Sequence, residues 1–148
     1  MSSSYPYPGY NFTLNILPFN FEKYDCSFQE ISGLNATVNV DTVREGGSNT
    51  YEYHLPTGTS WTTIKLKRGV IGGTPLLNWI NAAVGFFTFM PLPGMINLKD
   101  NSGRIVISWM FMDLYPVKFE TSSLDAMKNE LLFETFELHH SGYTRIDY

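Results

Sequence analysis

Alternation of apolar and polar residues is the dominant pattern along this chain, and it predicts strands. The pattern is clearest over residues 34–41, where Leu34, Ala36, Val38 and Val40 alternate with polar neighbours. Because successive side chains of a strand point to opposite faces, this segment is expected to be a half-buried strand. Further extended segments are predicted at residues 11–17, 27–31, 51–55, 61–67 and 131–140.

Turn-forming residues separate these segments. Gly46-Gly47-Ser48-Asn49 ends the long alternating strand, and Pro56-Thr57-Gly58 is expected to form another turn. Asn101-Ser102-Gly103 lies between two apolar runs, 96–100 and 104–114, which together predict a β-hairpin. The second run is apolar on both faces, as is typical of a central strand or of a strand pressed against another chain.

One segment has helical periodicity. Thr74 and Pro75 supply an N-cap and a first-turn proline, apolar residues follow at helical spacing, and Gly85 is expected to end the helix. About eight strands and one helix predict a mainly β protein, a β-barrel or β-sandwich with a flanking α-helix. The expected organisation is a flexible arm over residues 1–10, one domain over 11–142 and a C-terminal tail over 143–148.

The composition points to a contact surface. The 148 residues fit one domain, but only 16% of them are charged, against roughly 25% in typical soluble domains. A surface with so few charges is often covered by another molecule. The net charge of −4 lacks the basic footprint of a nucleic-acid-binding protein. A single cysteine and the absence of a secretory pattern favour assembly in a cytoplasm.

The uncharged stretch from Gly69 to Leu98 does not predict a membrane span. Glycine and proline residues divide it into pieces. The longest piece that could form one helix, Pro75 to Val84, is about half of what a bilayer requires.

Candidate chemistry is sparse. The neighbouring residues His139 and His140 would point to opposite faces of a strand, and no cluster of ligating residues accompanies them. Glu134 shares a strand face with apolar residues and is interpreted as a charge at a subunit interface or strand end. Neither a nucleophile with a base partner nor a phosphate-binding loop is present in the sequence. The sequence therefore predicts no catalytic residue, no metal site and no cofactor.

Aromatic residues make up 16% of the chain, and two interpretations follow. Core and interface packing is the first. The alternative is a carbohydrate-binding β-sandwich, which would need an exposed aromatic platform. Binding of single-stranded nucleic acid is disfavoured because the sequence lacks the basic groove that accompanies such platforms.

The order of short motifs resembles one family. The motifs run from about Phe12 to Gly142 and are FQEISGL (28–34), REGG (44–47), LKRG (66–69), YPVKF (115–119) and NELLFETFELHHSG (129–142). Each is weak alone, but the ordered series resembles the tail tube proteins of contractile T-even-type phages. The inner tube proteins of extracellular phage-tail-like injection particles are relatives of that family.

The resemblance implies a structural subunit, not an enzyme, that forms homo-hexameric rings stacked into a hollow tube. Its implied partners are further copies or paralogous tube proteins, sheath and baseplate proteins, and a cargo protein or DNA that passes without specific binding. Inter-subunit contacts are expected in two places, and these are Arg44, Glu45, Gly46 and Gly47 after the long strand, and Phe86, Phe87 and Phe89 after the helix.

The loop after the helix departs from the family pattern. Family members often carry charged residues where this chain has the uncharged run from Gly85 to Gly94. This difference leaves two roles open, a main tube subunit or an adaptor that starts the tube.

Overall fold

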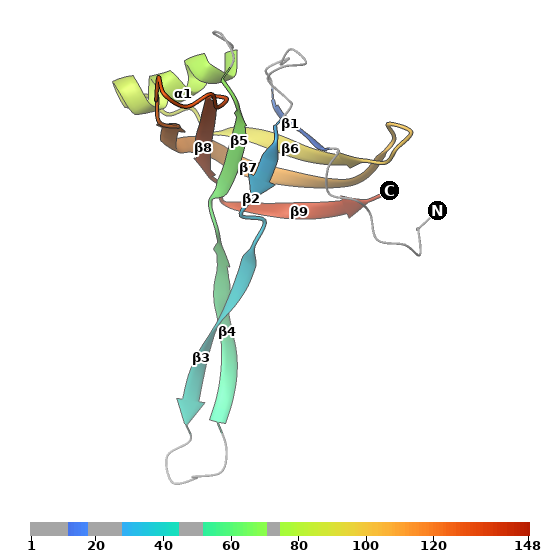
Figure 1. The fold of residues 1–148 in the computed structure, drawn as a ribbon. Coiled ribbons are helices and arrows are strands. Elements are labelled where there is room, and N and C mark those ends of the chain that lie inside the picture. The colour runs from blue at the N-terminus through green and yellow to red at the C-terminus, as the bar shows by residue number, and fades with distance from the viewer. Residues whose placement is uncertain (1–11, 18–27, 45–51, 71–74) are drawn as a thin grey trace.

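A computed structural model describes residues 12–17, 28–44, 52–70 and 75–148. These residues contain nine strands and one helix, which confirms the prediction of a mainly β protein with a flanking helix (Figure 1). The elements are β1 (Phe12–Ile16), β2 (Glu30–Ser32), β3 (Ala36–Arg44), β4 (Glu52–Trp61), β5 (Ile64–Gly69), α1 (Pro75–Phe86), β6 (Leu92–Lys99), β7 (Ile105–Thr121), β8 (Phe133–His139) and β9 (Gly142–Asp147).

Seven strands form one antiparallel sheet around the long strand β7. The order along the sheet is β1-β6-β7-β8-β5-β2, and β9 also pairs with β7. The first half of β7 lies between β6 and β9, whereas its second half pairs with β8. Asp113 lies between the halves with a φ of 53°, a conformation that marks a local change of strand direction.

The sheet does not close into the predicted barrel. Among the described strands, β1 pairs only with β6 and β2 only with β5, so both ends of the strand order remain edges. Exposed edges are templates for pairing with another chain. The predicted C-terminal tail is also wrong in part, because residues 142–147 form β9 and pair with β7.

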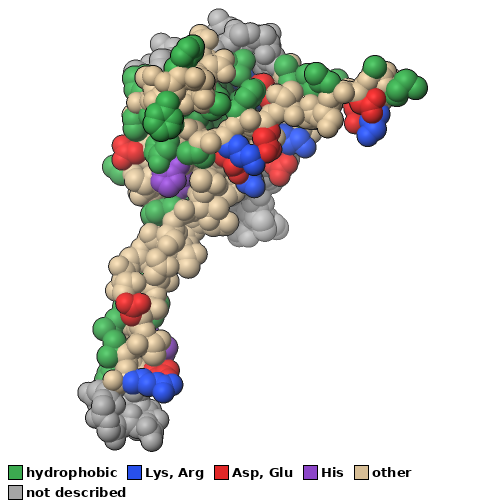
Figure 2. Space-filling model, turned by 90° about the vertical axis from the view of Figure 1, so that its left-hand side faces the viewer, with side chains coloured by type: hydrophobic (Ala, Val, Ile, Leu, Met, Phe, Trp, Pro, Cys, Tyr) green, Lys and Arg blue, Asp and Glu red, His purple; other side chains and the backbone are tan. Residues whose placement is uncertain are grey.

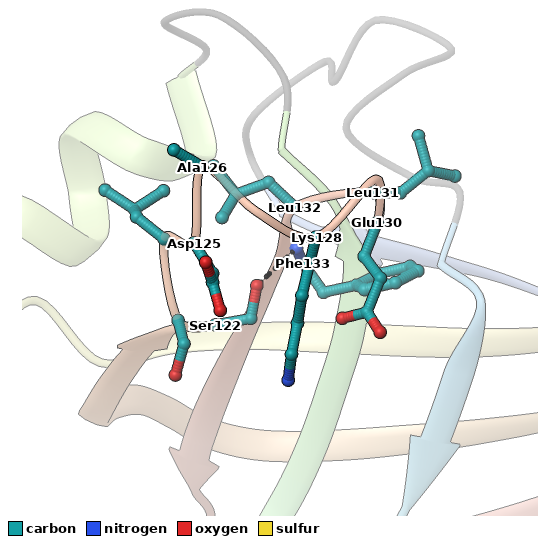
Figure 3. A pocket seen from close by; sticks show the side chains of 10 residues that line it. Ser122, Asp125, Ala126, Lys128, Glu130, Leu131, Leu132 and Phe133 are labelled. Atoms are coloured by element: carbon teal, nitrogen blue, oxygen red, sulfur yellow. Dashed lines mark hydrogen bonds between the residues drawn. The ribbon is translucent and has the colours of Figure 1, made fainter.

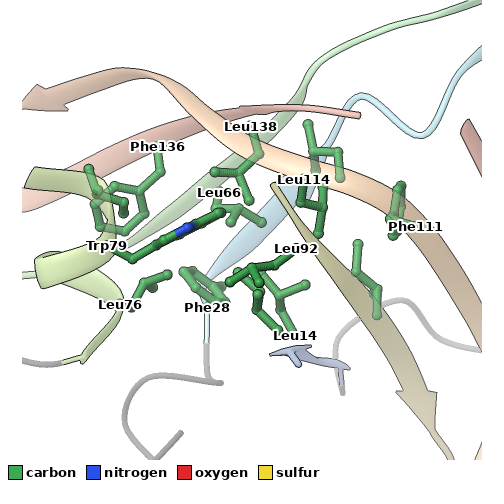
Figure 4. Packing of buried hydrophobic residues seen from close by; sticks show 14 residues of the cluster. Leu14, Phe28, Leu66, Leu76, Trp79, Leu92, Phe111, Leu114, Phe136 and Leu138 are labelled. Carbon is green, nitrogen blue, oxygen red and sulfur yellow. The ribbon is translucent and has the colours of Figure 1, made fainter. Parts of the chain in front are cut away.

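The sheet has two halves: β1, β6 and β9 lie with the first part of β7, and β8, β5 and β2 lie with its second part. The core lies between these halves and under α1 (Figure 4). Leu14 and Phe111 come from one half, Leu66 and Phe136 from the other, and all four are buried in one cluster. Trp79 joins them from α1, which confirms the apolar face predicted for the helix. The helix extends one residue beyond the predicted end at Gly85. It ends at Phe86, and Phe87 follows it with a φ of 51°.

Strands β3 and β4 form a separate two-stranded hairpin that projects from the body (Figure 1). Every residue of β3 is exposed, so the expectation of a half-buried strand is wrong for the subunit alone. The predicted turn at Pro56-Thr57-Gly58 is also wrong, because β4 runs through it. Thr57 bulges out of the register there, between the pairs Val40–Pro56 and Asn39–Gly58.

Candidate assembly surfaces

The projecting hairpin carries apolar side chains that nothing in the described chain covers. Val38, Val40, Val43, Tyr53 and Leu55 are all exposed. Alternation on a strand normally marks a face that packs against something, and here the described residues supply no second layer. The hairpin is therefore a candidate contact surface.

Charged residues of the hairpin lie toward its far end (Figure 2). The Arg44 side chain donates its Nε to the Glu52 carboxylate at 3.0 Å, and its Nη2 lies 2.9 Å from the same oxygen. This ion pair links Arg44, the last residue of β3, to Glu52, the first residue of β4. The other predicted contacts at this place, Glu45, Gly46 and Gly47, lie outside the described residues.

A second apolar surface follows α1. Phe86 and Phe87 are 81% and 84% exposed, and Phe89 is 40% exposed. The ring of Phe89 bridges Phe87 and Tyr115 at centroid distances of 4.9 and 5.8 Å. Figure 2 shows hydrophobic side chains gathered on this side of the body.

The loop that carries these phenylalanines is tied to the helix. The Thr88 amide donates to the Ala82 carbonyl at 2.9 Å, and the Trp79 indole donates to the Met90 carbonyl at 3.0 Å. The phenylalanine side chains are therefore held outward by a structured loop. Such exposed aromatic side chains are typical of protein–protein contacts.

The segment between β7 and β8 is a third exposed apolar surface, and the sequence analysis missed it. Leu124, Met127 and Leu131 are the most exposed large apolar side chains of this segment, with Met127 92% exposed. A hollow of about 910 Å³ lies beside them and is lined by residues 122–126, 128 and 130–133 (Figure 3). The sequence carries no clear signal for this surface, because single apolar residues in a polar segment can equally enter a core.

The outer side of β5, β8 and β7 carries alternating charges. Lys65 lies 3.4 Å from Glu137, which faces Lys118 across the strands, and Lys118 contacts Glu120 at 2.7 Å. Hydrogen bonding to Lys118 lowers the pKa of Glu120, and the same bond raises the pKa of Lys118. Opposite charges are thus paired within the subunit.

One ion pair is buried instead. Arg68 and Glu134 are 2% and 3% exposed, and Arg68 Nε donates to the Glu134 carboxylate at 2.7 Å. The guanidinium group also lies over the Phe28 and Phe136 rings. The interpretation of Glu134 as an interface or strand-end charge is therefore wrong. The adjacent strands β5 and β8 bring the two side chains together inside the core.

The described residues contain few groups that could take part in catalysis or metal binding. No group of three or more His, Cys, Asp or Glu within the described parts of the chain could hold a metal ion. His140 is buried against aromatic rings, and this burial lowers its pKa. In the same parts of the chain, no helix is both long and apolar enough to traverse a lipid bilayer.

The family model for the T4-like virus tail tube protein gp19 matches residues 8–144. The chain belongs to this tail tube family. Its family is therefore one of structural tube proteins, as the resemblance in the sequence implied. A search of curated proteins finds no match.

This tail tube protein is similar in structure to chains of contractile injection systems. It is similar to a chain of the anti-feeding prophage (AFP) baseplate, with 28% identity, a TM-score of 0.86, and 99% of this chain and 98% of that chain covered. A chain of the extended PVC sheath-tube complex has 23% identity and a TM-score of 0.81, covering 98% and 94%. Hcp1 from Flavobacterium johnsoniae shares the fold at 17% identity and a TM-score of 0.52, covering 93% and 99%.

Proposed function

We propose that this tail tube protein forms homo-hexameric rings in an extracellular contractile injection particle, at the baseplate end of its tube. The observation that carries the proposal is the match along the whole chain to a protein of the AFP baseplate, at 28% identity. The match to the PVC sheath-tube complex is lower in both identity and TM-score. This difference supports the role of an adaptor or initiating ring over that of the main repeating subunit.

The exposed surfaces support ring assembly. Among the described strands, β1 and β2 are edge strands that pair on one side only, so each leaves a free edge for another copy. Head-to-tail contacts between copies close into a ring when the rotation between them allows it. In the proposed ring, the hairpin with Arg44, Glu45, Gly46 and Gly47 contacts a neighbouring copy or an adjoining ring. The surface of Phe86, Phe87 and Phe89 contacts an apolar neighbour from the baseplate or sheath.

The proposed bore passes cargo protein or DNA without binding it. The chain has a net charge of −4, and the cations Lys65 and Lys118 are already paired with carboxylates. Tight DNA binding requires unpaired Lys or Arg groups that replace the counterions of phosphates. Assembly is proposed to take place in the bacterial cytoplasm, before the particle is released.

The direct test is negative-stain electron microscopy of the purified chain over a concentration series, with light scattering for mass. Rings with sixfold symmetry are expected. The same measurement is repeated after mixing with the baseplate and main tube proteins of the same particle, where incorporation next to the baseplate is expected. A protein that stays monomeric under both conditions would contradict the proposal.

The contact residues need their own test. Phe87→Asp places a charge on a side chain that is 84% exposed, so the monomer should keep its melting temperature while assembly is lost. Arg44→Ala should lower the yield of assembled particles in the same way. Normal assembly of either variant would remove that residue from the interface.

A further inference from the structure

Within the described residues, the β3–β4 hairpin is attached to the body through its base. Among the described strands, β3 and β4 pair with each other and with no third strand, so residues 33–35 and 61–63 set the direction of the hairpin. Gly33 has a φ of 92°, and a Cβ at this position would overlap the carbonyl oxygen of Thr63. The two connecting segments therefore touch backbone to backbone.

Four rings close around this base, and we call them the base cluster: Trp61, Phe111, His140 and Tyr143. Trp61, the last residue of β4, packs edge-on against Tyr143 and His140, at centroid distances of 4.8 and 5.9 Å. Phe111 of β7 lies 5.0 Å from His140 and 5.4 Å from Tyr143. Gly142 lies against the indole, where an added Cβ would be 3.2 Å from a ring carbon.

Two members of the base cluster also hold the connecting segments by hydrogen bonds. Tyr143 Oη donates to the Leu34 carbonyl at 3.3 Å, next to the start of β3. His140 Nε2 lies 2.8 Å from the Thr62 carbonyl, directly after β4. Since a carbonyl only accepts, Nε2 is the protonated nitrogen. One side chain thus holds each strand where it leaves the body.

We propose that Tyr143 and His140 are positioning residues that fix the direction of the hairpin relative to the body, so that it meets a neighbouring subunit at one angle. The inference rests on the proposed function in that the hairpin is taken to be an assembly contact. A strand of ten residues spans about 33 Å, so a rotation of about 10° at the base moves the far end by about 6 Å. The contact at the far end therefore depends on the base.

The experiment measures the direction of the hairpin by the distance between two spin labels. Cysteines are introduced by Val43→Cys on the hairpin and Thr121→Cys on β7, in a Cys26→Ser background, and labelled protein is diluted into unlabelled protein. Tyr143→Phe and His140→Phe keep a ring and remove the donor. The matched controls are Tyr115→Phe and His139→Phe, because these two rings pack together elsewhere, 5.0 Å apart.

Each Tyr143 and His140 variant should widen a narrow distance distribution, whereas the controls should leave it narrow. Assembly followed by light scattering should weaken roughly fivefold for Tyr143→Phe, as expected for the loss of one hydrogen bond. A distribution that stays narrow in both variants, or that widens equally in the controls, would overturn the positioning role.

A pH series separates positioning from simple packing. The described residues that face His140 are Trp61 of β4, Phe111 of β7, Tyr143 of β9 and its chain neighbour His139. Protonation of His140 places a charge among the rings, so the distance distribution should widen as the pH falls. His140→Phe should abolish this pH dependence, whereas His139→Phe should keep it, and the opposite pattern would overturn the inference.

Failure of the proposed function would look different. The label distances report on each subunit whether or not rings form. If no protein assembles but the variants still widen the distribution, the hairpin is positioned and the proposed function is wrong. If the wild type assembles and all distributions stay narrow, the positioning inference is wrong and the proposed function stands.

Discussion

The two long hairpins of this protein have similar sequence patterns, but one is packed in the core and the other is exposed. In the β6–β7 hairpin, inward side chains such as Ile96 and Phe111 enter the core between the two halves of the sheet. In the β3–β4 hairpin, Val38 and Val40 occupy comparable alternating positions on one face of β3, yet they stay exposed. Alternation thus identifies a face that is built to be covered, but it does not say whether the cover comes from the same chain.

The difference also separates stability from assembly. Burial of apolar surface stabilises the subunit by about 25 cal/mol per Å². The β6–β7 hairpin contributes buried apolar side chains to this core. The β3–β4 hairpin is held by strand pairing and by its base, so its outer positions are free to serve another molecule. Substitutions in the two hairpins should therefore affect different measurements.

The largest contrast should come from two aromatic truncations. Phe111→Ala should lower the free energy of unfolding by about 4 kcal/mol, because the residue is 1% exposed and its removal leaves a cavity. Tyr53→Ala on the projecting hairpin should cost about 0.5 kcal/mol or less, yet it should weaken assembly. Urea denaturation and light scattering measure the two effects. Equal loss of stability in both variants would mean that the hairpin packs on the body in solution.

A second contrast compares the ion pairs of the two regions. Glu134→Gln removes the carboxylate that lies 2.7 Å from the buried Arg68 guanidinium group, which should cost about 3 kcal/mol of unfolding free energy. Glu52→Gln removes the equivalent partner of Arg44, but that pair is exposed and screened by water, so no measurable change is expected. Urea denaturation at two salt concentrations checks this. A stability loss for Glu52→Gln that salt suppresses would contradict the prediction.

A smaller effect is expected from Gly94→Ala in β6. Its Cβ would overlap the Cδ1 of Leu114, which belongs to the packed side of β7, so a loss of about 2 kcal/mol is expected. Gly85→Ala in α1 meets open space and should instead raise stability by roughly 0.5–1 kcal/mol. Thermal melting of the two variants measures the difference. Equal melting temperatures would show that the sheet relaxes around the new methyl group.

The smallest effect concerns pH. Burial holds the pKa of His140 below its ordinary value of 6.5, so in this range the unfolded chain binds a proton that the folded chain resists. The free energy of unfolding should therefore be unaffected by His140 above pH 6.5 and should decrease as the pH falls below it. His140→Phe should flatten this part of the profile, and His139→Phe should preserve it. Urea denaturation between pH 5 and 8 is the measurement, and a decline that persists in His140→Phe would assign it to other groups.

Local patterns located most elements but not their environment. The helix, the β6–β7 hairpin and the strand within residues 61–67 follow from residue periodicity and turn chemistry. The turn expected at Pro56 failed because a bulge accommodates the proline within β4. Strand β9 was missed because residues 142–147 show little alternation and form a strand through pairing with β7.

The sequence pattern identified one of the exposed apolar surfaces of the body and missed the other. Phe86 and Phe87 were recognisable because an uncharged, phenylalanine-rich loop after a helix has no local reason to be apolar. Leu124, Met127 and Leu131 were missed because single apolar residues in a polar segment can equally enter a core. The base cluster could not be seen at all, since Trp61 and Tyr143 lie 82 positions apart in the chain.

The sequence by itself determined the strand-rich class, the single helix and the family, because periodicity and ordered motifs are local properties. Only the tertiary structure decided that the described strands form an open sheet and that Glu134 is neutralised inside the core by Arg68. It also decided that the described residues leave the long alternating hairpin uncovered. The physical reason is that burial and pairing are relations between distant segments. A strand presents the same alternating pattern whether its second layer is its own chain or a neighbour.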